Sequence, residues 1–248
     1  MKAKPATITN KIQAELILAL EQNKELSEFE IKKYQRDANL IPDYVDKNHV
    51  LGLLYTIEKN ESLMQMHFDN ALSSEIDITI LSNYFSSLNR LSCFSKSKEI
   101  LYKYKDYLNT NDLLIKALSV ASAYLDNDMA EFICKKAAMK QCDEEIVNVF
   151  NNRKKQILQI REMTNCSDEN IKSLVNICTK IIRKYNQKPS SLKLETIAGG
   201  HYVIGIDTDN LDTIVDMNFE LAEKIVANAE LDSCKLIAVF EPFIRGDK

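Results

Sequence analysis

Three histidines, His49, His67 and His201, are the first candidates for acid–base chemistry in this sequence. Histidine exchanges protons near neutral pH, but as a catalytic base it needs a serine or cysteine nucleophile arranged beside it. None of the three belongs to a recognisable nucleophile pattern. His201 follows Gly199 and Gly200, a pair that is typical of a hairpin turn, so a solvated turn histidine is the simpler interpretation.

Four aspartates, Asp207, Asp209, Asp212 and Asp216, gather where a strand pattern gives way to a helix pattern. Carboxylates in such a cluster could hold Mg²⁺ or Ca²⁺. Acidic residues are also favoured in the first turn of a helix because of its dipole, and this explanation is sufficient here. The sequence contains no glycine-rich phosphate-binding loop. We therefore predict no enzyme activity, no catalytic residue, no cofactor and no metal site.

Six cysteines are scattered along the chain without a CxxC pair or a regular spacing: Cys93, Cys134, Cys142, Cys166, Cys178 and Cys234. Such scatter favours buried, reduced thiols in a reducing compartment over a disulfide framework or a zinc site. No apolar signal segment follows Met1, and no apolar run approaches about 18 residues. The sequence therefore predicts a cytoplasmic protein that does not contact a membrane.

The composition favours long helices, since five glycines and four prolines are few for 248 residues. The net charge of −4 gives no general argument for nucleic-acid binding. The charged residues are unevenly distributed along the chain, however. Residues 132–188 contain twelve Lys or Arg against six Asp or Glu, and residues 189–248 contain five against eleven. A basic helical segment is thus followed by an acidic one.

A pattern recurs at a spacing of about 33 residues. Its clearest copy contains Leu51, Gly52, Tyr55, Met64, Phe68 and Ala71. This copy resembles the tetratricopeptide repeat, in which a Leu-Gly pair and an aromatic residue lie on the first helix of a pair, and an aromatic residue and an alanine on the second. Equivalent last positions are Ala38, Ala71, Tyr104 and Ala137. The resemblance covers about residues 8–141 and implies stacked antiparallel helix pairs with a shared core.

Apolar periodicity and short polar breaks predict ten helices before Pro189. They are expected near 7–22, 27–40, 47–58, 61–73, 77–91, 94–107, 111–125, 127–140, 143–163 and 167–187. The last two are longer and could cap the array. The period then changes, and the order of patterns is strand, hairpin, strand, helix, strand.

The predicted fold is therefore mostly α. A tetratricopeptide-like α-α superhelix at 1–188 is followed by a small β-β-α-β domain at 189–248. In tetratricopeptide arrays the first helices of the pairs line a groove that takes peptides or helices. The resemblance places these residues there: His49, Leu53, Thr56, Ser82, Ser86, Asn89, Arg90, Ile115, Ser119 and Ser122. Most are small and polar, and Arg90 could pair with an acidic partner residue.

The sequence thus favours a non-enzymatic module that binds a protein or peptide, such as an adaptor, a scaffold or a chaperone-like protein. A nucleic-acid-associated regulator is the first alternative. It would use the basic helices at 143–188, through Arg153, Lys154, Lys155, Arg161, Lys180, Arg183 and Lys184. A ligand-sensing or enzymatic C-terminal domain is the second alternative. That domain could also form a homodimer through an exposed strand edge.

Overall fold

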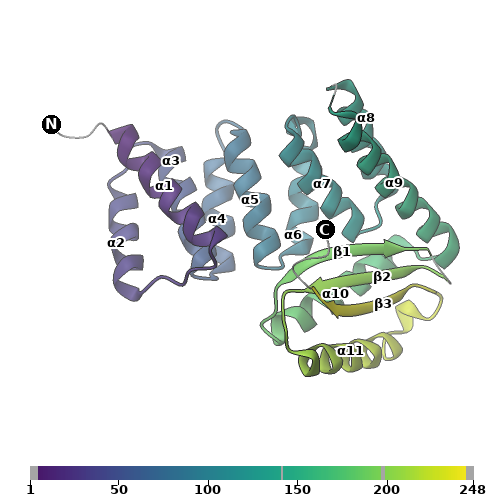
Figure 1. Cartoon of the computed structure of the whole chain (residues 1–248). Helices are drawn as coiled ribbons and strands as arrows, with labels where there is room; N and C mark the ends of the chain where they lie inside the picture. The colour runs from purple at the N-terminus through teal and green to yellow at the C-terminus, as the bar shows by residue number, and fades with distance from the viewer. Residues whose placement is uncertain (1–4, 141, 197–198, 244–248) are drawn as a thin grey trace. The chain divides into compact units, whose positions relative to one another are not determined.

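The computed structural model describes residues 5–140, 142–196 and 199–243 and shows a mostly helical protein with a small sheet (Figure 1). Its α-helices are α1 (Pro5–Glu21), α2 (Glu28–Asn39), α3 (Tyr44–Ile57), α4 (Glu61–Ala71), α5 (Ile78–Arg90), α6 (Phe94–Tyr104), α7 (Asn111–Ala123), α8 (Asn127–Met139), α9 (Glu144–Thr164), α10 (Asp168–Lys184) and α11 (Leu211–Val226). The remaining elements are β1 (Pro189–Glu195), β2 (His201–Ile206), β3 (Ile237–Pro242) and the short 3-10 helices η1 (Lys105–Tyr107) and η2 (Ala229–Leu231). The predicted fold class is confirmed, and helix ends agree within about three residues.

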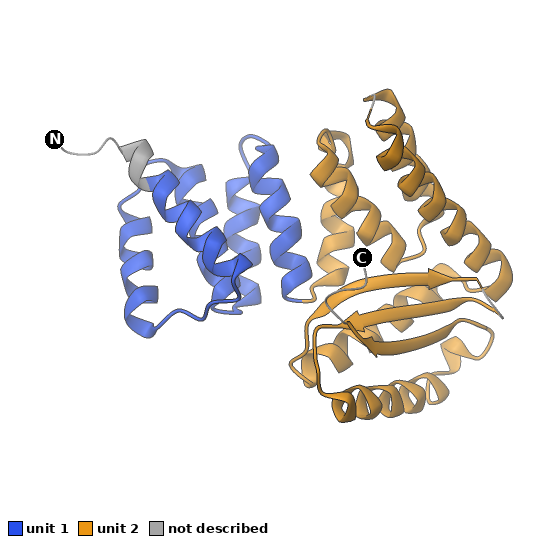
Figure 2. Cartoon of the chain, in the orientation of Figure 1, with its two compact units in different colours: residues 1–91 blue, residues 92–248 orange. Residues whose placement is uncertain are grey.

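The chain divides into two compact units (Figure 2). The first unit spans residues 1–91 and contains α1 to α5, and the second spans residues 92–248 and contains the other helices and the sheet. The sequence placed a boundary at 188, where the apolar period changes. In the structure this is where β1 begins, inside the second unit.

Polar residues at the breaks in the apolar pattern start the helices. In all described α-helices from α2 onward except α6 and α9, the N-cap side chain accepts a hydrogen bond from a backbone N–H two or three residues further on. These N-caps are Ser27, Asp43, Asn60, Asp77, Thr110, Asp126, Ser167 and Asn210. Each such cap stabilises its helix by about 1 kcal/mol, which explains why the helix starts follow the sequence so closely.

The first unit is organised around α3, which packs against α1, α2, α4 and α5. Gly52 allows the closest approach, because a β-carbon there would lie 2.9 Å from the ring of Phe68. Phe68 is fully buried on α4 and stacks on Tyr84 of α5, with ring centroids 4.8 Å apart. The small residue on α3 and the aromatic residue on α4 are therefore a matched pair, as the repeat pattern predicts.

Positions that recur every 33 residues or so are buried alike. Ala38, Ala71, Tyr104 and Ala137 are each no more than 4% exposed. Leu18, which lies 33 positions before the buried Leu51, departs from the pattern, because it is 50% exposed on α1. The protein is thus a helical array in which neighbouring helices share a core, which is compatible with a helical repeat.

The sheet in the second unit has the order β1-β2-β3. β1 and β2 are antiparallel, and β2 and β3 are parallel, because α11 carries the chain from β2 back to the start of β3. Helices α7 and α9 contact β1, while α11 contacts α10 and β3. The Tyr202 hydroxyl, buried on β2, donates to the carbonyl of Ala123 at the end of α7, 2.9 Å away. The sheet therefore shares its core with the helices that precede it.

Side chains cover part of each outer strand of this sheet. The N–H groups of Ile237 and Phe243 donate to the carbonyls of Gly200, just before β2, and of Ile206, so the N–H of Phe240 points away from β2. The Asn218 amide on α11 accepts from that N–H at 2.8 Å and donates to the Phe240 carbonyl at 2.9 Å, as a neighbouring strand would. On β1, Arg153 donates to the carbonyl of Leu192. Such contacts reduce the opportunity for strand pairing between copies of the chain.

Candidate functional site

The first unit contains seven of the residues predicted to line a groove, and three of them are buried. His49, Leu53 and Thr56 on α3 are no more than 4% exposed, and the Thr56 hydroxyl donates to the Gly52 carbonyl within its own helix. These three side chains therefore do not line an exposed groove in the structure, and their contact with a partner stays a prediction. Their helix is covered on several sides by its neighbours, so they form the core of the array.

His49 is held between two side-chain amides. Its Nδ1 lies 3.2 Å from Gln13 Nε2 on α1, and its Nε2 lies 2.9 Å from Asn83 Nδ2 on α5. Burial lowers the pKa of His49 to about 4, although the charge of Asp77 acts in the opposite direction. The imidazole is therefore neutral at physiological pH and links three helices, which is a structural role rather than that of a catalytic base.

Arg90 also has a structural role. Its guanidinium donates to the carbonyl of Leu20 and to Asn23 Oδ1, both at 2.8 Å, and so satisfies groups at the C-terminal end of α1. Burial lowers the pKa of this half-buried arginine. The Arg90 guanidinium therefore binds groups of its own unit, and its pairing with an acidic partner residue stays a prediction.

The rest of the predicted set in the first unit lies on α5. Ser86 and Asn89 are exposed, and Ser82 is half-buried in the same line along the helix. The opposite side of α5 is apolar and buried, with Leu81, Tyr84 and Leu88 each fully enclosed. Helix α5 thus combines a fixed apolar side with an outer face of short polar side chains.

In the second unit the predicted set is divided in the same way. Ile115 and Ser119 are exposed on α7, whereas Ser122 is buried and donates to the carbonyl of Leu118. The Ser119 hydroxyl donates to the carbonyl of Ile115 within the helix. Ser122 therefore cannot contact a partner, and the exposed part of α7 is reduced to a short apolar and polar patch.

The basic helices use most of their arginines internally. Arg153 donates to the Leu192 carbonyl, Arg161 to the Leu125 carbonyl, and Arg183 to the Ser92 carbonyl. Lys184 pairs with Glu220 of α11. Among the predicted nucleic-acid contacts, only Lys155 and Lys180 are exposed with no contact described for them. A contiguous basic surface is therefore smaller than the sequence count indicates.

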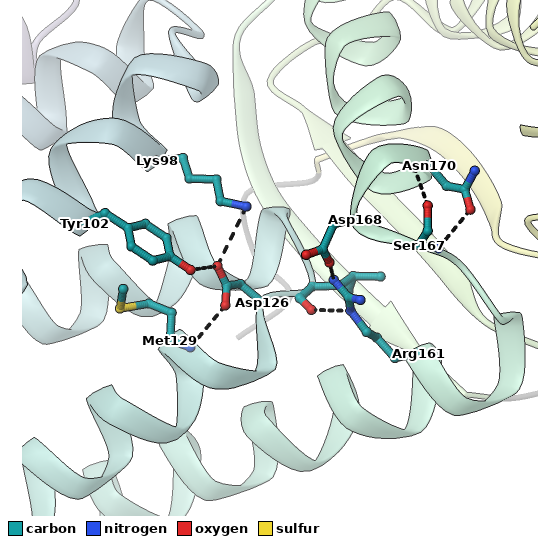
Figure 3. A network of polar contacts seen from close by, with 9 residues as sticks. Lys98, Tyr102, Asp126, Met129, Arg161, Ser167, Asp168 and Asn170 are labelled. Carbon is teal, nitrogen blue, oxygen red and sulfur yellow. Dashed lines mark hydrogen bonds and ion pairs between the residues drawn. The ribbon is translucent and has the colours of Figure 1, made fainter. Parts of the chain in front are cut away.

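A polar network surrounds the start of α8 and the turn between α9 and α10 (Figure 3). The Asp126 carboxylate accepts from the Met129 N–H and from the Tyr102 hydroxyl, 2.6 Å away, and lies 3.8 Å from Lys98 Nζ. Burial and this hydrogen bond raise the pKa of Tyr102. One carboxylate therefore caps α8 and ties it to two side chains of α6.

Arg161 on α9 fixes the turn between α7 and α8, which contains Leu125. Its Nε donates to the carbonyl of Leu125 at 2.7 Å, and its Nη2 donates to Asp168 at the start of α10. The Arg161 guanidinium lowers the pKa of Asp168. Leu125 has a φ of 47°, which is unusual for a leucine, and its carbonyl is fixed by this arginine. The network thus anchors a strained turn and contains no activated nucleophile.

A disulfide between Cys166 and Cys234 corrects the prediction that all six cysteines are reduced. It joins the α9–α10 turn to the segment between η2 and β3, where Lys235 N–H also donates to the Thr164 carbonyl. The sequence could not show this pairing, because the two residues are 68 positions apart and no spacing links them. Cys93, Cys134, Cys142 and Cys178 are thiols outside this disulfide.

The disulfide borders an open depression of about 610 Å³. Its lining residues are Arg161, Glu162, Asn165, Cys166, Ser167, Asn170 and Ser233. Ser167 and Asn170 are engaged in the capping box of α10, and Arg161 is engaged as described above. These three polar side chains of the depression thus stabilise the turn itself.

Metal ligands and membrane spans are not found in residues 5–140, 142–196 and 199–243. No group of three or more His, Cys, Asp or Glu there could hold a metal ion. No helix in these ranges is long and apolar enough to cross a membrane. Asp212 lies in the first turn of α11, which agrees with the explanation by the helix dipole.

The fold defines a class of protein, namely a helical array joined to a small mixed sheet. No protein-family model, curated protein or solved structure is significantly similar to this chain. Function must therefore be argued from the residues themselves.

Proposed function

We propose that the chain is a non-enzymatic protein-binding module, such as an adaptor, a scaffold or a chaperone-like protein. The observation that carries the proposal is the outer face of α5, where Ser82, Ser86 and Asn89 follow one another at i, i+4 and i+7. Short polar side chains leave room for an incoming chain and offer hydrogen bonds at a small entropic cost. The buried opposite side of α5 keeps this face in place.

We further propose that the array is of the tetratricopeptide kind. The matched pair of Gly52 and Phe68 supports this, as does the shared burial of Ala38, Ala71 and Ala137. In that class the first helices of the pairs meet the ligand. Because His49, Leu53 and Thr56 on α3 are buried, we place the proposed contact on α5.

Nucleic-acid binding has less support, because Arg153, Arg161 and Arg183 are engaged by backbone carbonyls. A ligand-sensing role for the sheet has less support as well, since Arg161, Ser167 and Asn170 beside the depression of about 610 Å³ already have partners within the chain. The proposed cytoplasmic location was based on reduced cysteines. The Cys166–Cys234 disulfide removes that argument, and the location stays a prediction.

The test is affinity capture from the native cell with the full-length chain, with and without nuclease. The variant Ser86→Arg with Asn89→Arg places bulk and charge on the α5 face and leaves its core unchanged. A matched control, Lys32→Glu with Lys33→Glu, alters exposed residues of α2 in the same unit. We expect a protein captured by the parent and by the control, lost by the α5 variant, and unaffected by nuclease. Capture that disappears with nuclease would support the nucleic-acid alternative instead.

A further inference from the structure

Helix α11 has two apolar faces, of which only one is covered. Ile214, Met217 and Leu221 are buried against the rest of the second unit. A second line of apolar residues is exposed: Leu211 (62%), Val215 (49%), Phe219 (69%), Ala222 and Val226 (83%). Their spacing of four, four, three and four positions places them within an arc of about 80° on a helix of about 3.6 residues per turn.

This exposed line differs from the single apolar residues found elsewhere on the surface. Isolated exposed apolar side chains are normal, whereas a continuous row along a whole helix marks a surface that is covered in a complex. The row here extends from the first to the last residue of α11. Its side chains recur every three or four positions, which is the spacing at which one helix packs against another.

The helix is also held in a fixed position. Asn218, next to Phe219, makes two hydrogen bonds with the backbone of Phe240 on β3. Glu220 pairs with Lys184 of α10, and Asn228, just after the helix, donates to the Ser173 hydroxyl at 2.7 Å. The exposed row therefore needs little ordering before it binds, which lowers the entropic cost of association.

The charge beside the row indicates the chemistry of the partner. Asp212, Asp216 and Glu223 are exposed and lie on the side of the row that faces away from the buried face. No lysine or arginine of α11 lies among them, since Lys224 falls on the opposite side of the helix. A partner that covers the row would place its own side chains next to three carboxylates.

We propose that the exposed face of α11 docks a basic amphipathic helix of a partner protein. Its apolar residues would pack between Leu211, Val215 and Phe219, and its Lys or Arg residues would pair with the acidic row. A second copy of this chain would bring a second acidic row, and an anionic membrane would be repelled. This surface is distinct from α5 and does not depend on the function proposed for that face.

The test measures binding of three synthetic helical peptides of about 18 residues, or five turns, to the full-length chain. The peptides share one leucine face and carry Lys, Gln or Glu on the other. We expect the Lys peptide to bind at least about tenfold more tightly than the Glu peptide. Asp212→Lys with Asp216→Lys and Glu223→Lys should reverse this order. Phe219→Ser should weaken the Lys peptide by about tenfold or more.

Matched controls keep the outcome decisive. Phe29→Ser changes an equally exposed phenylalanine (79%) on α2 and should leave binding unchanged. The α5 variant Ser86→Arg with Asn89→Arg should leave it unchanged as well, so failure of one proposal is distinguishable from failure of the other. An unaltered melting temperature of Phe219→Ser confirms that the fold is intact.

Three results would overturn the proposal. The first is a Lys-peptide affinity that Phe219→Ser and the charge reversal do not change. The second is a dimer, seen by light scattering, that Phe219→Ser dissociates, because the occupant would then be a second copy. The third is binding to phosphatidylcholine vesicles that Phe219→Ser abolishes while the peptides do not bind, because the occupant would then be a lipid surface.

Discussion

The two units are stabilised in different ways. In residues 1–91, helices that are neighbours in the sequence pack closely against each other, as where the small residue Gly52 lies against the ring of Phe68. Both units contain hydrogen bonds between distant residues, such as Arg90–Leu20 in the first and Arg161–Leu125 in the second. In residues 92–248 the Cys166–Cys234 disulfide adds a covalent link between segments 68 positions apart. The comparison shows that local packing can be predicted from spacing, whereas links between distant positions require the fold.

The largest expected effect concerns the disulfide of the second unit. We expect Cys234→Ser to lower the free energy of unfolding of residues 92–248 by about 3–4 kcal/mol, because the bridge closes a long loop. Calorimetry of the full-length chain should show the loss in one transition only. Cys142→Ser, which removes a free and partly exposed cysteine, is the control. An equal loss in both units would contradict the division between them.

The second largest expected effect concerns the close contact between Gly52 and Phe68 in the first unit. Gly52→Ala should destabilise residues 1–91 by up to about 3 kcal/mol, because the Phe68 ring that the new methyl group meets is fixed by Tyr84. Urea unfolding followed by far-UV circular dichroism measures the change. Ser82→Ala, on the outer face of α5, should cost much less. If Gly52→Ala is as stable as the parent, helices α3 and α4 are further apart than described.

Acid should weaken the first unit in particular. The folded pKa of His49 is about 4 and its unfolded value is near 6.5, so the unfolded chain binds the proton first. The free energy of unfolding is therefore not lowered by His49 above about pH 6.5. It falls as the pH drops toward 4, by about 2 kcal/mol between pH 7 and pH 5. His49→Gln should reduce this slope between pH 7 and pH 5 and leave the part that comes from His67, whose pKa burial also lowers. Identical slopes for parent and variant would show that His49 is not buried and neutral.

The smallest expected effect concerns the link at the end of α1. Arg90→Met keeps the aliphatic part of the side chain but removes the donors to Leu20 and Asn23. We expect a loss of about 1 kcal/mol in the first unit. Hydrogen exchange at the C-terminal end of α1 should become faster, while exchange in the second unit stays the same. Unchanged exchange at α1 would assign Arg90 to the surface, as the sequence first indicated.

The helices were predictable because their signals are local. Apolar spacing set the buried faces, and N-caps such as Asn60 and Thr110 set the starts. The order strand, strand, helix, strand along the chain was predictable as well, since a change to alternating residues follows Pro189. The candidate site was harder to predict from the sequence. Burial of His49 depends on which helices surround α3, and no local pattern contains that information.

The apolar row on α11 was visible in the sequence but ambiguous. Leu211, Val215 and Phe219 have a helical spacing of three or four positions, as does the buried set Ile214, Met217 and Leu221. Periodicity shows that a helix has apolar faces, but only the packing shows which face is covered. The role of Asn218 was hidden for a similar reason, because its partner Phe240 is 22 positions away.

The claim that this protein binds another protein through an exposed helix face is tested most directly by photo-crosslinking in the native cell. A benzophenone amino acid replaces Ser86 on α5, and in a second experiment it replaces Phe29 on α2 as an exposed control. We predict that Ser86, but not Phe29, joins the chain to a protein, and that nuclease does not remove the adduct. Adducts that nuclease removes, or equal adducts from both positions, would contradict the account.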